Sequence, residues 1–77
     1  MSKNLHCNLI FRPEVEGGFT VIIPALPGCI TYGSNLVEAK AMALDAIKAY
    51  LQSVRKHGGE VMSDDQSFIA SLDVAYA

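Results

Sequence analysis

Residues 16–33 read EGGFTVIIPALPGCITYG, and the order of the first structural elements follows from this stretch. Residues 19–23 form a β-branched and aromatic run, which favours a strand. The loop at residues 24–28 contains two prolines and a glycine, and proline cannot donate a hydrogen bond to a strand ladder. The apolar pattern resumes at residues 29–32. The stretch therefore predicts two short strands separated by a rigid turn.

An alternating segment precedes this stretch, at residues 5–12. Its apolar residues occupy every second position and are Leu5, Cys7, Leu9 and Phe11. A period of two is typical of a strand packed on one side. Pro13 and the pair Gly17-Gly18 then supply a turn. We expect residues 5–12, 19–23 and 29–32 to form an antiparallel three-stranded meander.

A helix is predicted from about residue 36 to residue 57. Asn35, followed three residues later by Glu38, forms an approximate capping box at its start. At 100° per residue, one face of the helix is apolar. That face consists of Leu36, Ala39, Ala43, Ile47, Tyr50, Leu51 and Val54. The glycine pair at residues 58–59 can adopt the left-handed conformation that ends a helix, so we expect an amphipathic helix laid on the sheet.

Residues 67–75 alternate again and predict a fourth strand. One side of this strand would carry Phe68, Ala70, Leu72 and Val74, and the other Ile69, Ser71 and Asp73. A polar linker, residues 60–66, joins it to the helix. Crossovers between parallel strands are right-handed, so the fourth strand should lie parallel to the first. The predicted fold class is α+β, with β-β-β-α-β order and a four-stranded mixed sheet (order 3-2-1-4) carrying one helix on one face.

Composition limits the domain organisation and the class of protein. The 77 residues are 51% hydrophobic and 18% charged, which is too apolar for a disordered chain, and they are enough for one domain spanning 1–77. The net charge of −2 lacks the basic footprint of a nucleic-acid binder. No apolar run approaches the roughly 18 residues of a membrane helix, and the N-terminus does not read as a signal peptide. We therefore expect a cytoplasmic protein without membrane contact.

A single helix covers only one face of such a sheet. The other face would carry Ile10, Ile22 and Ile69 among polar residues. A contiguous apolar patch usually marks an interaction surface, whereas scattered isoleucines are ordinary surface residues, and the sequence leaves both interpretations open. A chain this short also has a small core and two unpaired sheet edges. We expect a homodimer or higher homo-oligomer.

The stretch at residues 16–33, together with the capped helix behind it, resembles the HicB family of bacterial antitoxins. The positions that carry the resemblance are Gly17, Gly18, Phe19, Pro24, Leu26, Pro27, Gly28, Cys29, Thr31 and Gly33. The resemblance implies a degraded ribonuclease-H-like fold and a protein that inhibits HicA, a small basic mRNA ribonuclease, by masking its catalytic histidine. Many family members carry a further DNA-binding segment that this sequence does not show. We therefore expect no C-terminal DNA-binding domain and no direct DNA binding.

Candidate catalytic and metal-binding residues do not assemble into a site. Two-metal hydrolysis needs converging carboxylates, and the three expected strands contain none. His6 and Cys7 are adjacent on a strand and would point to opposite faces. Structural zinc needs four ligands, and the sequence offers two distant histidines. We expect no enzyme activity, no catalytic residue, no metal and no cofactor.

The expected partner-binding residues are Ile10, Ile22, Leu26, Glu14 and Glu16. The two glutamates could steer a basic nuclease, although glutamates in a turn are usually just solvated. Leu26 is either core filling or a partner contact. The function indicated is an antitoxin-like protein that neutralises a HicA-type ribonuclease by occluding its active site. The alternative is a stand-alone oligomeric binding domain, an orphan HicB-like protein without a toxin partner.

Overall fold

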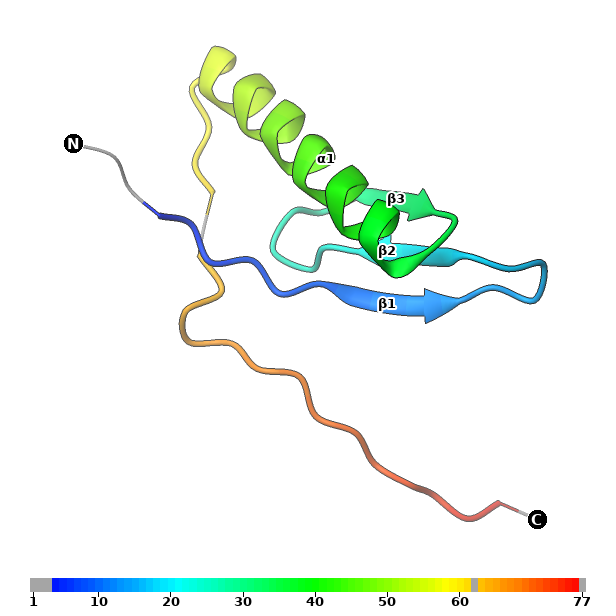
Figure 1. Cartoon of the computed structure of the whole chain (residues 1–77). Coiled ribbons are helices and arrows are strands. Elements are labelled where there is room, and N and C mark those ends of the chain that lie inside the picture. Colours follow the sequence, from blue (N-terminus) through cyan, green and yellow to red (C-terminus); the bar gives the residue numbers. More distant parts are fainter. Residues whose placement is uncertain (1–3, 62, 77) are drawn as a thin grey trace.

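The computed structural model describes residues 4–61 and 63–76. It contains three strands and one helix, namely β1 (Ile10–Pro13), β2 (Phe19–Ile22), β3 (Ile30–Gly33) and α1 (Leu36–Lys56). The strands form an antiparallel sheet of order β1-β2-β3, and α1 packs on one face of it (Figure 1). The predicted meander and the predicted helix are confirmed, with strands somewhat shorter than the patterns suggested.

The register of the sheet separates two faces. Phe11, Val21 and Thr31 align across the three strands, and Val21 is fully buried under α1. Because successive side chains of a strand alternate, the neighbouring row points the other way. The core lies between the sheet and the helix and consists of Val21, Ile23, Leu26, Cys29, Ala39 and Ala43. α1 contacts β3 and β2 but not β1.

The loop between β2 and β3 folds back into this core. The Leu26 amide donates to the Ile23 carbonyl at 3.0 Å, and the Cys29 amide donates to the Leu26 carbonyl at 2.9 Å. The Ile23 amide closes the loop on the Cys29 carbonyl at 3.2 Å. These bonds satisfy the backbone while the Leu26 side chain, 1% exposed, fills the core.

The helix start follows the predicted capping box with one change. The Asn35 side chain accepts a hydrogen bond from the Glu38 amide at 2.8 Å, as expected for an N-cap. The Glu38 carboxylate accepts from the Ser34 amide and hydroxyl at 2.9 and 3.0 Å, rather than from Asn35. These two bonds, which favour the charged carboxylate, lower the pKa of Glu38.

Close packing between β3 and α1 depends on small residues. A Cβ atom at Gly33 would fall on the backbone nitrogen and Cα of Ala39. Ala39 and Ala43, the helix residues that face the sheet, are both fully buried. The helix therefore approaches the sheet at the level of the backbone, and its first turn lies directly on β3.

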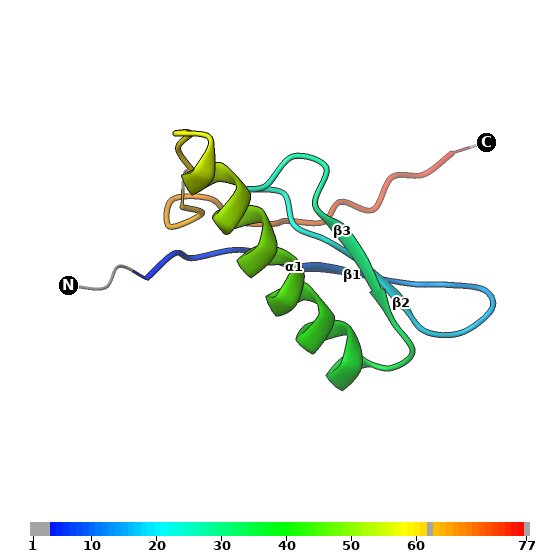
Figure 2. The same cartoon turned by 90° about the horizontal axis from the view of Figure 1, so that it is seen from above.

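The prediction of a fourth strand is wrong. Residues 67–76 form no strand and leave the body as an extended chain that diverges from β1 (Figures 1 and 2). The four-stranded mixed sheet of order 3-2-1-4 and its right-handed crossover are therefore absent from the described residues, which form a three-stranded sheet. Alternation gives a segment the pattern of a strand, but a strand also needs an edge to pair with, and alternation does not say which edge.

The linker before this segment is clamped to the N-terminal part of the chain. Asp64, only 8% exposed, accepts a hydrogen bond from the Asn8 amide at 3.0 Å and donates its own amide to the His6 carbonyl at 2.7 Å. The Ser63 hydroxyl accepts from the His6 amide, and the Asn8 side chain donates to the Ser67 carbonyl. Hydrogen bonds of the polar linker thus connect residues 63–67 to residues 6–8 near the N-terminus.

Candidate functional site

One face of the sheet is left uncovered by the helix. Its first row consists of Ile10, Ile22 and Ile30, which are cross-strand partners, and its second row consists of Arg12, Thr20 and Tyr32. We call these six residues the open sheet face. Ile30 is 61% exposed and Tyr32 is 49% exposed, although both are large apolar side chains. A row of three isoleucines beside an aromatic and a cation is a surface suited to binding another protein.

Hydrogen bonds hold the second row in position. The Thr20 hydroxyl donates to the Glu14 carboxylate at 2.7 Å, and the Arg12 guanidinium lies 3.8 Å from the same carboxylate. The Tyr32 hydroxyl donates to the Gly17 carbonyl at 2.8 Å. A Cβ at Gly18 would overlap this hydroxyl, so the glycine allows Tyr32 to lie across the hairpin. The hairpin and the open sheet face therefore form one continuous, ordered surface.

The structure separates the five residues expected to bind a partner. Ile10 and Ile22 are Cα partners and lie together on the open sheet face. Glu14 and Glu16 lie on the β1–β2 hairpin beside it, half-buried and exposed respectively. Leu26 belongs to the core on the other side of the sheet, so the core-filling interpretation holds for this residue.

Three residues of the open sheet face, Arg12, Ile30 and Tyr32, were not predicted from the sequence. Ile30 and Tyr32 are two positions apart in β3, and the intervening Thr31 aligns with the buried Val21. The same period of two that assigned the first two strands assigns them to the open face.

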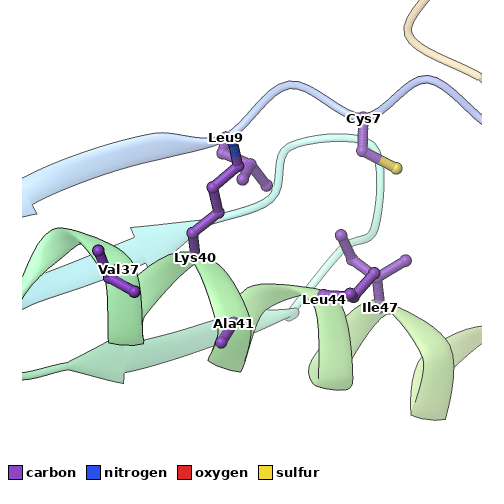
Figure 3. A pocket seen from close by; sticks show the side chains of 7 residues that line it. All are labelled: Cys7, Leu9, Val37, Lys40, Ala41, Leu44 and Ile47. Carbon is purple, nitrogen blue, oxygen red and sulfur yellow. The ribbon is translucent and has the colours of Figure 1, made fainter.

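A second apolar surface lies between the segment before β1 and the helix. It is an open groove of about 490 Å³ lined by Cys7, Leu9, Val37, Lys40, Ala41, Leu44 and Ile47. In Figure 3, Cys7 and Leu9 face the helix across the gap, and the Lys40 side chain reaches up toward Leu9. Val37 and Leu44 are exposed and lie outside the predicted helix face, seven positions apart and therefore on one side of the helix. We call this surface the β1–α1 groove.

Both cysteines are free thiols with suppressed ionisation. Burial raises the pKa of the Cys7 thiol, and the neighbouring Asp64 and Cys29 raise it further. Burial also raises the pKa of Cys29, which belongs to the core. The thiolate is the reactive form, so both thiols are less reactive at a given pH than a free cysteine.

We therefore expect slow, graded reaction with a thiol reagent such as DTNB. Half-buried Cys7 should react first, with a rate that rises at higher pH than for a model thiol, and Cys29 should react only on unfolding. Unfolded without reductant, the chain should yield two thiols, because both cysteines are free in the folded protein. Recovery of fewer than two from freshly purified protein would contradict this expectation.

The remaining titratable groups form no metal centre in the described ranges. No cluster of three or more histidine, cysteine or acidic side chains within residues 4–61 and 63–76 could hold an ion. In the same part of the chain, no helix combines the length and apolarity needed to cross a membrane. The structure offers two apolar surfaces, the open sheet face and the β1–α1 groove, on a small α+β body.

Comparison with known proteins gives the family. The HicB_like antitoxin family of bacterial toxin-antitoxin systems matches residues 8–74. This range contains the whole sheet, the helix and most of the extended C-terminal segment. The chain belongs to the HicB-like antitoxin family, which confirms the resemblance seen in the sequence.

Three relatives illustrate the similarity. A UPF0150 protein of Thermoplasma acidophilum is 37% identical over 57 residues, which cover 74% of this chain and 83% of the relative. A UPF0150 protein of Helicobacter pylori is 31% identical over 62 residues, covering 80% and 86%. Antitoxin HicB 1 of Photorhabdus laumondii is 40% identical over 45 residues, covering 58% of this chain and 29% of the relative.

Proposed function

We propose that this protein is an antitoxin that binds a HicA-type mRNA ribonuclease in the cytoplasm and neutralises it by covering its active site. The observation that carries the proposal is the open sheet face of a member of an antitoxin family, with a row of three isoleucines of which Ile30 is exposed and Ile10 and Ile22 are partly buried. A protein that inhibits by binding needs such a surface and needs no chemistry of its own. The proposed mechanism therefore involves no enzyme activity and no cofactor.

The open sheet face has the composition of an interface centre. Ile22 and Ile30 would supply apolar burial at the centre, and Tyr32 and Arg12 are residue types that often dominate binding energy. Arg12 is an exposed side chain 3.8 Å from the Glu14 carboxylate and is accessible to an acidic or carbonyl group of a partner. The hydrogen bonds of Thr20 and Tyr32 hold their side chains in position, which supports binding with little rearrangement at these two residues.

Charge on the hairpin supports a basic partner. Glu14 and Glu16 project from the same end of the sheet, and the whole chain carries a net charge of −2. Opposite charges mainly speed and orient the encounter of two proteins, whereas apolar anchors mainly slow dissociation. Glu16, which is exposed and free of the Thr20 bond, is the better candidate for steering.

Co-expression with a neighbouring gene for a small basic HicA-type ribonuclease tests the proposal. The antitoxin should relieve growth arrest and co-purify with the toxin. Ile30→Asp should abolish rescue and the complex, because it places an unpaired charge in the centre of the interface. Met42→Asp, the same charge change at a part-exposed position on α1, should preserve both.

Two results would count against the proposal. Growth arrest unchanged by the wild-type chain, with no co-purifying complex, would reject the antitoxin function and favour the alternative of a stand-alone oligomeric binding domain. Equal loss of rescue in Ile30→Asp and Met42→Asp, with both variants folded by circular dichroism, would show that the open sheet face is not the specific contact.

A further inference from the structure

The segment that failed to form the predicted fourth strand carries an unusual amount of exposed apolar surface. We call residues 68–76 the C-terminal tail. Its large apolar side chains are between 54% and 96% exposed and are Phe68, Ile69, Leu72, Val74 and Tyr76. Single exposed apolar residues are ordinary, but five within nine positions make a continuous apolar strip that a soluble protein covers.

Ser67, the residue just before the tail, is held in place by hydrogen bonds. Ser67 accepts a hydrogen bond from the Asn8 side chain and donates its amide to the Asp64 carbonyl at 3.0 Å. Asp64 is itself bonded to His6 and Asn8. The tail therefore leaves the body from a defined point beside the segment that enters β1, and it runs away from β1 toward its end (Figures 1 and 2).

Each copy of the protein also carries a surface suited to accept such a tail, formed by the edge of β1 and the β1–α1 groove. β1 pairs only with β2 among the described strands, so the other edge of residues 10–13 has no partner strand. The stretch just before β1 is already bonded to the linker through His6 and Asn8. Beside this edge lies the β1–α1 groove, which is open because α1 sits over β2 and β3 and does not contact β1. Unpaired backbone groups next to an apolar groove are the two features that an added strand requires.

We propose that two copies of this protein exchange their C-terminal tails. The tail of each copy adds as a strand to the free edge of β1 in the other copy, and one row of its side chains enters the β1–α1 groove. The row with Phe68, Ala70, Leu72 and Val74 faces the groove, while Ser71 and Asp73 face away from it. This inference concerns the chain alone and does not depend on the proposed antitoxin function.

The direction and length of the tail favour pairing with β1 of a second copy over pairing with β1 of the same chain. The tail diverges from β1 of the same chain and does not run alongside it (Figure 1). Nine extended residues reach about 30 Å at roughly 3.3 Å per residue, which is more than twice the length of the four-residue β1. The tail is therefore long enough to cross to a neighbour and still pair along the whole edge.

The area available is also sufficient. Phe68 and Tyr76 would each bury about 150–250 Å². With both tails exchanged, four aromatic rings alone provide about 600–1,000 Å², before the aliphatic side chains and the body contacts are added. Stable interfaces bury about 1,200–2,000 Å² in total, a range that the reciprocal exchange can reach.

The first test is the mass of the protein in solution, measured by light scattering during gel filtration at tens of micromolar. The wild type should be a dimer or a multiple of it. Leu72→Asp should be monomeric, because it places a charge in the groove, whereas Ser71→Asp, the same charge on the opposite row one position away, should remain assembled. A chain ending after Ser67 should also be monomeric and retain wild-type helix content by circular dichroism, because the tail contributes nothing to the core.

The second test distinguishes exchange from closure within one chain. Cys7 lines the groove, so a cysteine placed on the groove-facing row should form a disulfide with Cys7 of the other copy. Single substitutions Phe68→Cys, Ala70→Cys, Leu72→Cys and Val74→Cys are oxidised with copper phenanthroline and run on a non-reducing gel. At least one should give a covalent dimer that disappears when Cys7→Ser is added, and Ser71→Cys should give none.

Each contrary outcome overturns the proposal. A monomeric wild type, or an assembly that Leu72→Asp and the shortened chain leave intact, would show that the tail does not join the copies. An intrachain disulfide in place of the covalent dimer would show that the tail closes on its own body. Toxin neutralisation is measured separately by growth rescue, so failure of the tail exchange can be distinguished from failure of the proposed antitoxin function.

Discussion

Replacing Gly33 with alanine is expected to lower the midpoint of thermal unfolding by about 12–24 °C. A Cβ at this position would collide with the backbone of Ala39 in the first turn of α1. Overpacking costs about 1–3 kcal/mol, and more where the obstacle cannot move, so we expect about 3 kcal/mol or more. In a domain of this size each kcal/mol shifts the midpoint by about 4–8 °C.

Gly59→Ala is the matched control. Its Cβ would meet a methyl group of Val54 at 3.1 Å, which a small side-chain movement relieves, and its backbone is not left-handed. We expect a change in the free energy of unfolding within about 0.5 kcal/mol. Thermal unfolding followed by circular dichroism at 222 nm compares the two variants. Similar midpoints for both would mean that α1 does not rest on β3 at Gly33.

Leu26→Ala should reduce the free energy of unfolding by about 2–5 kcal/mol, because it opens a cavity under the β2–β3 loop. Leu26 is 1% exposed and lies among the core residues, and its backbone is held in the loop by two hydrogen bonds. Urea unfolding monitored by circular dichroism measures the loss. Leu36→Ala, which removes the same atoms from a side chain 54% exposed at the helix start, should change little.

The Leu26 variant also separates a core role from a contact role. At a temperature where Leu26→Ala is still folded, its affinity for the toxin should equal that of the wild type. A stable Leu26→Ala protein with weakened toxin binding would contradict the structure and assign the loop tip to the interface.

The two proposals assign different binding partners to the open sheet face and to the β1 edge with its groove. The open sheet face binds the toxin, and the β1 edge with its groove binds a second antitoxin chain. Ile10 and Arg12 lie in β1 and also on the open sheet face, so they belong to both surfaces. An exchanged tail would place Ile69 on the face that carries Ile10, which would widen the apolar surface offered to the toxin.

Local signals in the sequence were sufficient for the meander, the rigid turn and the helix. Each rests on residues a few positions apart: the period of two in the strands, the prolines and glycine of the turn, and the Asn35–Glu38 cap. Such interactions form within a single strand, turn or helix, so they can be predicted from residues that are close together in the sequence. The family resemblance rested on the same residues and was confirmed by the match over residues 8–74.

The candidate site was predictable only in part. Ile10 and Ile22 could be placed on a common face from alternation, but their pairing with Ile30 follows from the register. The burial of Leu26 follows from a loop that folds inward, and the groove follows from α1 lying over β2 and β3 rather than β1. These features depend on how separate elements are placed, which no single element encodes.

Residues 67–75 have the apolar alternation of a strand, which can be read from the sequence, but in the folded chain they pair with no strand among the described residues. A helix satisfies its hydrogen bonds internally, so the 36–56 helix could be predicted without knowing its neighbours. A strand takes its hydrogen bonds from another strand, and which edge is free and within reach is a property of the folded chain. The same alternating pattern therefore has two outcomes. In β1 the hairpin places β2 alongside as a partner, whereas the C-terminal tail has no partner strand and stays exposed.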